Sequence, residues 1–306
     1  MTESSARAKL NNRVIPVAKS PGNSTYDCVR LFKRAIRLEK VGHAGSLDPQ
    51  AIGLILILTG EATKLSNYLM DLPKRYIADV RLGATTDTQD ESGRILKTGS
   101  WANVDREAVE AALNRFTGKR FQTPPMYSAL KHKGTPLYML ARRGEKIDRN
   151  PRQVDTYSIT LLDFKPPIVR VEVYCSRGLY LRVLAEEIGD ALAVPAHLGT
   201  LVRMRIGHFT LDEAVPDGEF EKLIEADSPG YSLAEAVGHF PAVTLSEEQS
   251  RGLSCGMIPK LHPGTHAALP GQGALLRLQR PDGSLGAIAE MGLGGLIQLR
   301  RVFRES

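Results

Sequence analysis

Hydrophobic residues recur with the period of an α-helix in three parts of the chain, namely residues 26–40, a stretch that begins near residue 105, and residues 178–193. In the first of these, Val29, Phe32 and Ile36 fall on one face. Ser24 and Thr25 lie just before this stretch, and both are favourable residues at the start of a helix. The spacing therefore predicts three amphipathic helices that each bury one face.

Five other stretches have the apolar runs or the alternation that is typical of β-strands: residues 54–58, 76–82, 154–164, 168–175 and 198–211. Pro166 and Pro167 mark the turn between two of them. Strands that follow one another, then a helix, then a further strand, predict a mixed, mostly antiparallel α+β sheet instead of a regular doubly wound fold.

Glycine becomes frequent after about residue 245, where glycines separate short apolar runs such as residues 274–278. This pattern is typical of a small β-barrel, here of about sixty residues. We therefore expect two domains, one of residues 1–240 that holds the chemistry and a smaller one of residues 241–306.

The composition, with 42% hydrophobic and 24% charged residues among 306, is that of a globular protein with a sizeable core. The chain starts without an apolar leader, and its longest uncharged apolar stretch is far short of a membrane span. We expect a cytoplasmic protein without membrane attachment. Its three cysteines stand apart, which fits neither a disulfide framework nor a zinc site.

Positive charge is concentrated in residues 119–152, which contain nine Lys or Arg and only two acidic residues. This segment alone carries +7, more than the +6 of the whole chain. Phe121, Tyr127 and Tyr138 are interleaved with the charges. A solvated, mobile insertion is one interpretation, and an arm that binds nucleic-acid phosphates is the other.

Two segments have the features of a catalytic motif. Residues 252–256 match the nucleophile elbow of hydrolases, but the preceding residues are too polar for a buried strand and no histidine follows Asp282 to complete a triad. Asp48 instead lies in a glycine-rich loop of residues 42–53, between a predicted helix and a predicted strand. Such an aspartate caps a turn or performs chemistry, and this residue alone does not distinguish the two.

The surrounding sequence resembles the signature of the TruB family of tRNA pseudouridine synthases. The resemblance rests first on GHAGSLDPQAIG at residues 42–53 and TGEATK at 59–64. It continues at Lys19, GNSTYD (22–27), KRY (74–76), LGATTDT (82–88), PMYSALK (125–131), CSRGLYLR (175–182) and residues 198–203, so that it spans about residues 12–210. The C-terminal segment resembles the PUA domain that is common in this family.

The resemblance implies that Asp48 is the catalytic carboxylate. It would act at the sugar C1′ of uridine 55 in the tRNA T loop, supporting cleavage of the glycosidic bond and reattachment of the base through C5. Arg182 would pair with Asp48 and favour its ionised form. Tyr76 would stack on the flipped uracil, and Tyr180 and Leu201 would line the pocket.

The resemblance further implies that His43 fills the space left in the RNA loop by the extruded nucleotide. Five basic residues would hold phosphates: Lys64, Lys131, Arg142, Arg143 and Arg203. The enzyme would need neither a metal nor an organic cofactor, would bind the T arm of tRNA without a guide RNA, and would work as a monomer. The basic insertion of residues 119–152 would be its thumb.

The sequence departs from the family pattern at Ala44, Gln50 and Ile52, and reads Ala-Lys-Ser at residues 18–20 where Asp-Lys-Pro is usual. None of these positions carries an assigned chemical group. Two alternatives remain: a non-catalytic RNA-binding or RNA-folding protein, and the related synthase that depends on a guide RNA. The intact Asp48, Tyr76 and Arg182 set favours an enzyme, and the basic insertion favours the stand-alone type.

Overall fold

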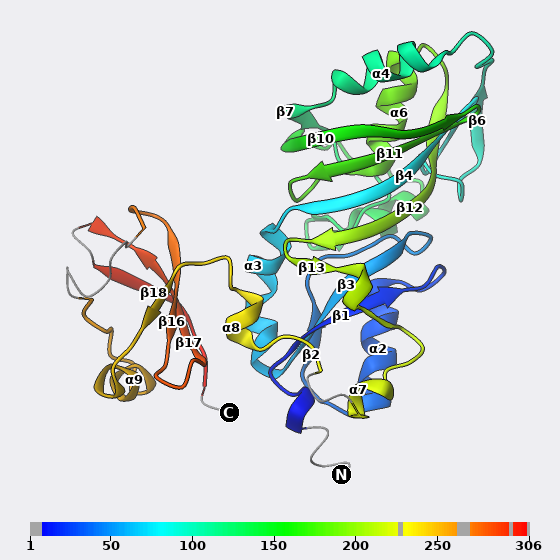
Figure 1. The fold of residues 1–306 in the computed structure, drawn as a ribbon. Helices are drawn as coiled ribbons and strands as arrows, with labels where there is room; N and C mark the ends of the chain where they lie inside the picture. The colour runs from blue at the N-terminus through cyan, green and yellow to red at the C-terminus, as the bar shows by residue number, and fades with distance from the viewer. Residues whose placement is uncertain (1–7, 226–228, 262–269, 294–295, 305–306) are drawn as a thin grey trace.

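The computed structural model describes residues 8–225, 229–261, 270–293 and 296–304. Figure 1 shows an elongated unit built on one large sheet and a smaller C-terminal unit beside it. Gly264, Gly294 and Gly295, which belong to the glycine-rich pattern, lie outside the described residues. No helix within the described ranges is long and apolar enough to cross a membrane.

The large sheet is mixed and mostly antiparallel, which confirms the predicted α+β class. Two of its pairings are parallel, β1 with β14 and β3 with β12. Along the sheet the order is β14 (Val215–Pro216), β1 (Val14–Lys19), β3 (Ile52–Thr59), β12 (Ala196–Ile206), β4 (Lys74–Leu82), β11 (Ile168–Cys175), β10 (Arg152–Lys165) and β7 (Gly118–Gln122), with β2 (Val41–His43) added to β3 and β13 (Phe209–Thr210) to β12.

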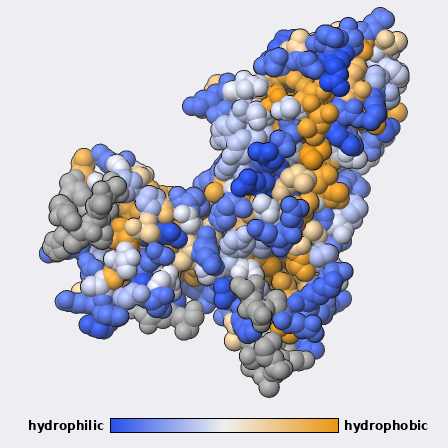
Figure 2. All heavy atoms as spheres, viewed as in Figure 1, coloured by the Kyte–Doolittle hydropathy of each residue, from blue (hydrophilic) through white to orange (hydrophobic). Residues whose placement is uncertain are grey.

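The three predicted helices form close to their expected positions, as α2 (Thr25–Ile36), α4 (Arg106–Asn114) and α6 (Leu181–Ala191). Helix α2 begins where Ser24 and Asp27 form a reciprocal capping box, and Phe32 on its inner face is fully buried. Helices α4 and α6 cover one face of the sheet (Figure 1). Figure 2 shows a band of apolar atoms along the elongated unit. Ile77 on β4 and Val202 on β12 are only partly buried.

Shorter elements connect these parts: η1 (Gly60–Leu65), α3 (Ser66–Asp71), β5 (Ala84–Thr86), β6 (Ile95–Thr98), η2 (Leu211–Glu213), α7 (Lys222–Glu225) and α8 (Leu233–Ala236). The strand predicted over residues 198–211 ends at Ile206, because the chain turns back through Gly207 in a left-handed conformation and resumes as β13.

The basic segment of residues 119–152 is part of the large sheet at both of its ends, unlike a mobile insertion. Strand β7 pairs with the start of β10, so both ends of the segment are sheet strands. Between them lie β8 (Lys131–His132), β9 (Thr135–Pro136) and α5 (Leu137–Arg142). We call the part between the two strands, residues 123–151, the arm.

The C-terminal unit contains a four-stranded sheet in the order β15 (Ala242–Thr244), β16 (Leu275–Gln279), β17 (Leu285–Met291) and β18 (Ile297–Val302). Among the described residues β18 does not pair with β15, so a closed barrel of PUA type stays a prediction. A helix that the glycine pattern did not indicate, α9 (Glu247–Ser254), packs on this sheet. Ser254 ends that helix, so residues 252–256 do not form a strand-to-helix elbow.

Candidate active site

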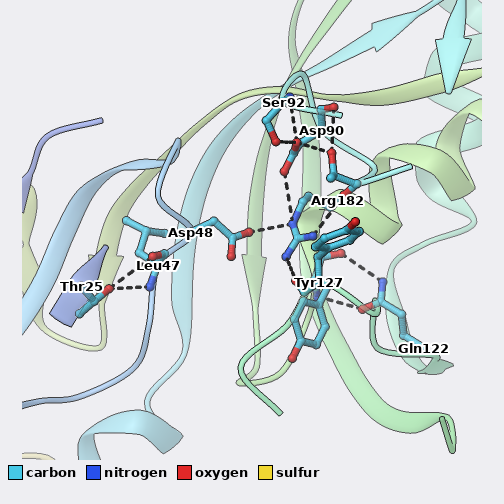
Figure 3. Close-up of polar contacts among 10 residues, drawn as sticks. Thr25, Leu47, Asp48, Asp90, Ser92, Gln122, Tyr127 and Arg182 are labelled. Carbon is cyan, nitrogen blue, oxygen red and sulfur yellow. Dashed lines mark hydrogen bonds and ion pairs between the residues drawn. The ribbon is translucent and has the colours of Figure 1, made fainter. Parts of the chain in front are cut away.

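An ion pair between Asp48 and Arg182 lies at the centre of the site (Figure 3). The Asp48 carboxylate accepts a hydrogen bond of 2.8 Å from Nε of Arg182, across 134 residues of sequence. The Asp48 side chain is 45% exposed and the Arg182 side chain only 4%. The pair therefore presents a carboxylate to the outside and keeps its cation inside, which confirms the contact predicted for these residues.

Three further groups hold the guanidinium of Arg182 in one orientation. Nη1 donates to the carbonyl oxygen of Thr88 (3.2 Å) and Nη2 to that of Tyr127 (2.7 Å). The Asp90 carboxylate lies 3.8 Å from Nε and is itself fixed by hydrogen bonds from Thr88 and Ser92. A planar guanidinium suits several acceptors in fixed directions, which the single ammonium of a lysine could not satisfy together.

Side-chain hydrogen bonds hold the backbone of the loop on both sides of Asp48. The hydroxyl of Thr25, at the start of α2, accepts from the Leu47 amide (2.9 Å) and donates to the Leu47 carbonyl (3.4 Å). On the other side Nζ of Lys19 donates to the Pro49 carbonyl (3.0 Å). Lys19 is 2% exposed, and burial is the main cause that lowers its pKa. Both neighbours of Asp48 are thus attached to the scaffold through their backbones.

Arg203 lies beneath this loop, and its predicted role is corrected. Its side chain is 2% exposed, and it donates to the carbonyl oxygens of Leu54 (2.6 Å) and Ser46 (3.1 Å). Nη2 has no hydrogen-bond partner among the described residues, but at 2% exposure the guanidinium is not accessible to an RNA phosphate. Gly53 allows the strands to approach here, since its φ is +104° and an added Cβ would lie 2.5 Å from the Arg203 carbonyl oxygen.

Tyr76 and Leu201 come from the adjacent strands β4 and β12, and each is 8% exposed within the core cluster that also includes Leu47. Burial raises the pKa of the Tyr76 phenol, with Arg203 opposing and the Asp48 charge contributing. Burial likewise raises the pKa of Tyr180, whose environment also includes the charges of Arg182 and Asp48. Tyr76 and Tyr180 are therefore close enough to Asp48 to be affected by its charge, and Leu201 lies in the same core cluster as Tyr76.

His43 is partly buried on β2, next to the loop that carries Asp48. Burial is the first cause that lowers its pKa, and Arg203 is the second. Among the described residues Nδ1 of His43 has no hydrogen-bond partner. Burial therefore favours the neutral form of this imidazole, and its Nδ1 lacks a partner among the described residues.

The remaining predicted phosphate ligands occupy two places. Lys131, Arg142 and Arg143 are exposed on the arm, where they are accessible to a bound polyanion. Lys64 instead pairs with Glu61 and donates to the carbonyl oxygen of Val302 in β18 (3.0 Å), so it joins the large unit to the C-terminal one. Of the five predicted phosphate ligands, the three on the arm are therefore the ones whose side chains are exposed.

Sequence patterns had given no role in the site to Asp90, Gln122 or the Tyr127 carbonyl, and had given Thr25 only a place at a helix start. Gln122 is 2% exposed and binds both backbone groups of Tyr180. Thr25 and Tyr127 lie in segments that carry the family resemblance, which was a usable signal, whereas Asp90 and Gln122 lie outside those segments.

The described residues offer no cluster of side chains for a metal ion at this site. Within the described ranges no group of three or more His, Cys, Asp and Glu side chains could hold a metal ion. A cavity of about 750 Å³ lies elsewhere, between the first described residues and the C-terminal unit, where Arg13, Arg280 and Arg304 line it. The Asp48 side chain, at 45% exposure, is accessible from the surface.

Known proteins resemble this chain over most of its length. Residues 33–181 match the model of the TruB family pseudouridylate synthase (N terminal domain). A protein of Geobacter sulfurreducens named tRNA pseudouridine synthase B is 37% identical over 94% of this chain and 98% of its own length. A protein with the same name from Chromohalobacter salexigens is 39% identical over 90% of this chain and 89% of its own.

Solved structures show where the fold recurs. A Cbf5–Nop10–Gar1 complex contains a chain that superposes with a TM-score of 0.74 at 24% identity, over 98% of this chain and 87% of that one. An archaeal box H/ACA Nop10–Cbf5 complex gives 0.73 at 22% identity, over 97% and 88%. At this level of identity the likeness concerns the fold alone.

Proposed function

This chain belongs to the TruB family of pseudouridylate synthases, and from that premise we propose that it converts uridine 55 in the T loop of tRNA to pseudouridine, with Asp48 as the catalytic carboxylate. That it is an enzyme, an isomerase that forms pseudouridine in tRNA, follows from relatives with this name that align with nearly all of it. The position in tRNA and the residues that act are the proposal.

The Asp48–Arg182 ion pair is the observation that supports the chemical part. Isomerisation breaks the bond from C1′ to N1, turns the uracil, and forms a bond from C1′ to C5. C5 then loses a proton and N1 gains one, so the composition is unchanged. Positive charge develops on the sugar as the first bond breaks, and an adjacent carboxylate stabilises that charge. Asp48 meets this demand because its carboxylate is exposed while Arg182 holds it from behind.

The surface around Asp48 supports an extruded substrate. The reacting C1′ and C5 of a uridine stacked in an RNA loop are out of reach of a protein carboxylate, so the nucleotide must leave the stack. Tyr76 and Leu201 would contact the base, and the His43 side chain would occupy the space it vacates. The nonpolar surroundings of Tyr76 favour a flat, uncharged ring such as uracil.

Binding of the RNA would rest on shape and charge. Lys131, Arg142 and Arg143 would contact phosphates of the T arm, which fixes the position of a folded loop without reading its sequence. We propose that one chain does this alone, without a guide RNA. The basic arm supports this, since it gives the chain its own means of gripping RNA. The C-terminal unit would add RNA contacts as a PUA-like domain of residues 241–306, beside a catalytic domain of residues 1–240.

The test is to incubate the purified chain with an unmodified tRNA transcript and map pseudouridine at single-nucleotide resolution. We expect modification of the T-loop uridine with no added RNA or protein, and modification of a hairpin that contains only the T arm. Modification at another tRNA position would refute the proposed site, and a requirement for added guide RNA would refute the stand-alone mode.

A further inference from the structure

Gln122 makes an unusual pair of contacts with a backbone segment of the site. It is the last residue of β7 and is 2% exposed. Its Oε1 accepts from the amide of Tyr180 (2.9 Å), and its Nε2 donates to the carbonyl oxygen of the same residue (3.3 Å). Nε2 also lies 3.4 Å from the Glu187 carboxylate on α6. One side chain thus satisfies both backbone groups of Tyr180.

The segment that Gln122 holds sets the direction of the catalytic arginine. Tyr180 directly precedes α6, and no side chain caps the helix at this residue. Arg182 follows two residues later, in the first turn. Since the start of a helix has amides without internal partners, a fixed backbone before it decides where the first side chains point. Gln122 therefore determines the place of Tyr180 and, through the helix start, that of Arg182.

Gln122 is also the point from which the arm departs. The arm begins at the next residue, and Tyr127 within it accepts a 2.7 Å hydrogen bond from Nη2 of Arg182 (Figure 3). The first turn of the arm is consequently attached to the segment of Tyr180 and Arg182 at two points, a side chain at its base and a backbone carbonyl further along.

We propose that Gln122 is a positioning residue, which couples the RNA-binding arm to the Asp48–Arg182 ion pair. A change in the path of the arm is transmitted through Gln122 and the Tyr127 carbonyl to the guanidinium that orients Asp48. The coupling makes the geometry of catalysis depend on how the arm is placed on RNA. This inference rests on the proposed function, because it assumes that Asp48 performs the chemistry and the arm binds tRNA.

Two substitutions separate positioning from general stability. Gln122→Ala removes both contacts with Tyr180. Gln122→Glu keeps the size and the acceptor, but an ionised carboxylate cannot donate to the Tyr180 carbonyl and repels Glu187; a protonated one can donate. The rate of Gln122→Glu should therefore rise relative to wild type as the pH falls, an effect that a purely structural defect does not produce.

The control is Arg170→Gln, which breaks a charge-assisted contact with Asp79 on the opposite face of the sheet. Single-turnover pseudouridine formation is measured at saturating tRNA, together with tRNA affinity by filter binding and the melting temperature. For Gln122→Ala we expect a rate loss of about 10- to 100-fold, as small misplacements of catalytic groups cause. Affinity should change less than about threefold, and Arg170→Gln should keep the wild-type rate.

A wild-type rate for Gln122→Ala would overturn the proposal, as would a loss due entirely to weaker tRNA binding. If Gln122→Ala does not fold, the pH profile of Gln122→Glu decides: a profile parallel to that of wild type overturns the proposal. These results differ from failure of the proposed function, in which the wild-type protein itself forms no pseudouridine or Asp48→Asn retains full activity.

Discussion

Replacing Thr25 by valine tests whether its hydrogen bonds with the backbone of Leu47 hold the loop that carries Asp48 in place. Thr25 is 3% exposed, and its hydroxyl contacts both the amide and the carbonyl of Leu47, the residue before Asp48. Valine has nearly the same shape without the hydroxyl, so the packing is retained while the buried Leu47 amide loses its partner. A buried donor without a partner costs about 1–3 kcal/mol.

This cost opposes the loop conformation that places Asp48 against Arg182. Because 1.4 kcal/mol corresponds to about a tenfold change in an equilibrium constant, we expect kcat to fall by about tenfold and by no more than about 100-fold. The melting temperature should fall by about 3 °C for a cost near 2 kcal/mol, because the unfolding entropy of a chain of 306 residues is about 0.6 kcal/mol/K. Single-turnover pseudouridine formation and thermal unfolding measure the two effects.

Thr25→Ser is the matched control, since it keeps the hydroxyl and loses one methyl group. It should retain most of the rate. The reasoning is refuted if Thr25→Val isomerises tRNA as fast as wild type, or if Thr25→Ser is as slow as Thr25→Val, because the effect would then come from packing and not from the hydrogen bonds.

Three further outcomes follow from the structure. Gly53→Ala should destabilise the protein by about 1–3 kcal/mol in urea unfolding, because its φ of +104° and the 2.5 Å approach to Arg203 exclude a side chain; an unchanged midpoint would contradict this. The combined change of Lys131, Arg142 and Arg143 to glutamine should lower the slope of log affinity for tRNA against log salt by about 2 while the saturated rate is kept; an unchanged slope would exclude them as phosphate ligands. The pKa of His239 is lowered to about 4, first by partial desolvation of a residue that keeps an exposed surface and then by the charges of His208 and Arg277, so the unfolded chain binds more protons between pH 6.5 and 4 and stability falls as the pH decreases through this window. His239→Phe should flatten that part of the curve of melting temperature against pH. Identical curves for the variant and wild type would show that His239 does not cause the loss of stability.

Local patterns along the chain were sufficient to predict most helices and strands of the large unit. Helix α2 and strands β3 and β4 follow from apolar periodicity and caps that act over a few residues. Helix α9 was missed although Ser246 and Gln249 form a capping box, a signal available in the sequence, because the glycine pattern around it favoured strands.

Contacts of the site between residues far apart in sequence could be predicted only from the long family motif. The resemblance gave the Asp48–Arg182 contact, which joins residues 134 positions apart. It also suggested a phosphate contact for Arg203, because an arginine beside a catalytic motif has the same appearance in sequence whether it faces RNA or lies under a loop. Burial decides between these roles, and burial depends on how β3 and β12 meet.

Gln122, unlike Arg203, was given no role by the sequence, although it contacts the site in the structure. A glutamine at the end of a strand has no sequence pattern that distinguishes it from a solvated one. Its importance arises when β7 pairs with β10 and brings it to Tyr180, 58 residues away.

The central claim is that the carboxylate of Asp48 performs the chemistry while other groups place it. The most direct measurement is the pseudouridine yield at the T-loop uridine for Asp48→Asn, beside wild type, with enough enzyme to bind all of the tRNA. Asp71→Asn, a change at an exposed carboxylate on α3, is the control. For Asp48→Asn we expect full binding of tRNA and no detectable isomerisation, and for Asp71→Asn the activity of wild type. Isomerisation by Asp48→Asn near the wild-type rate would contradict the central claim.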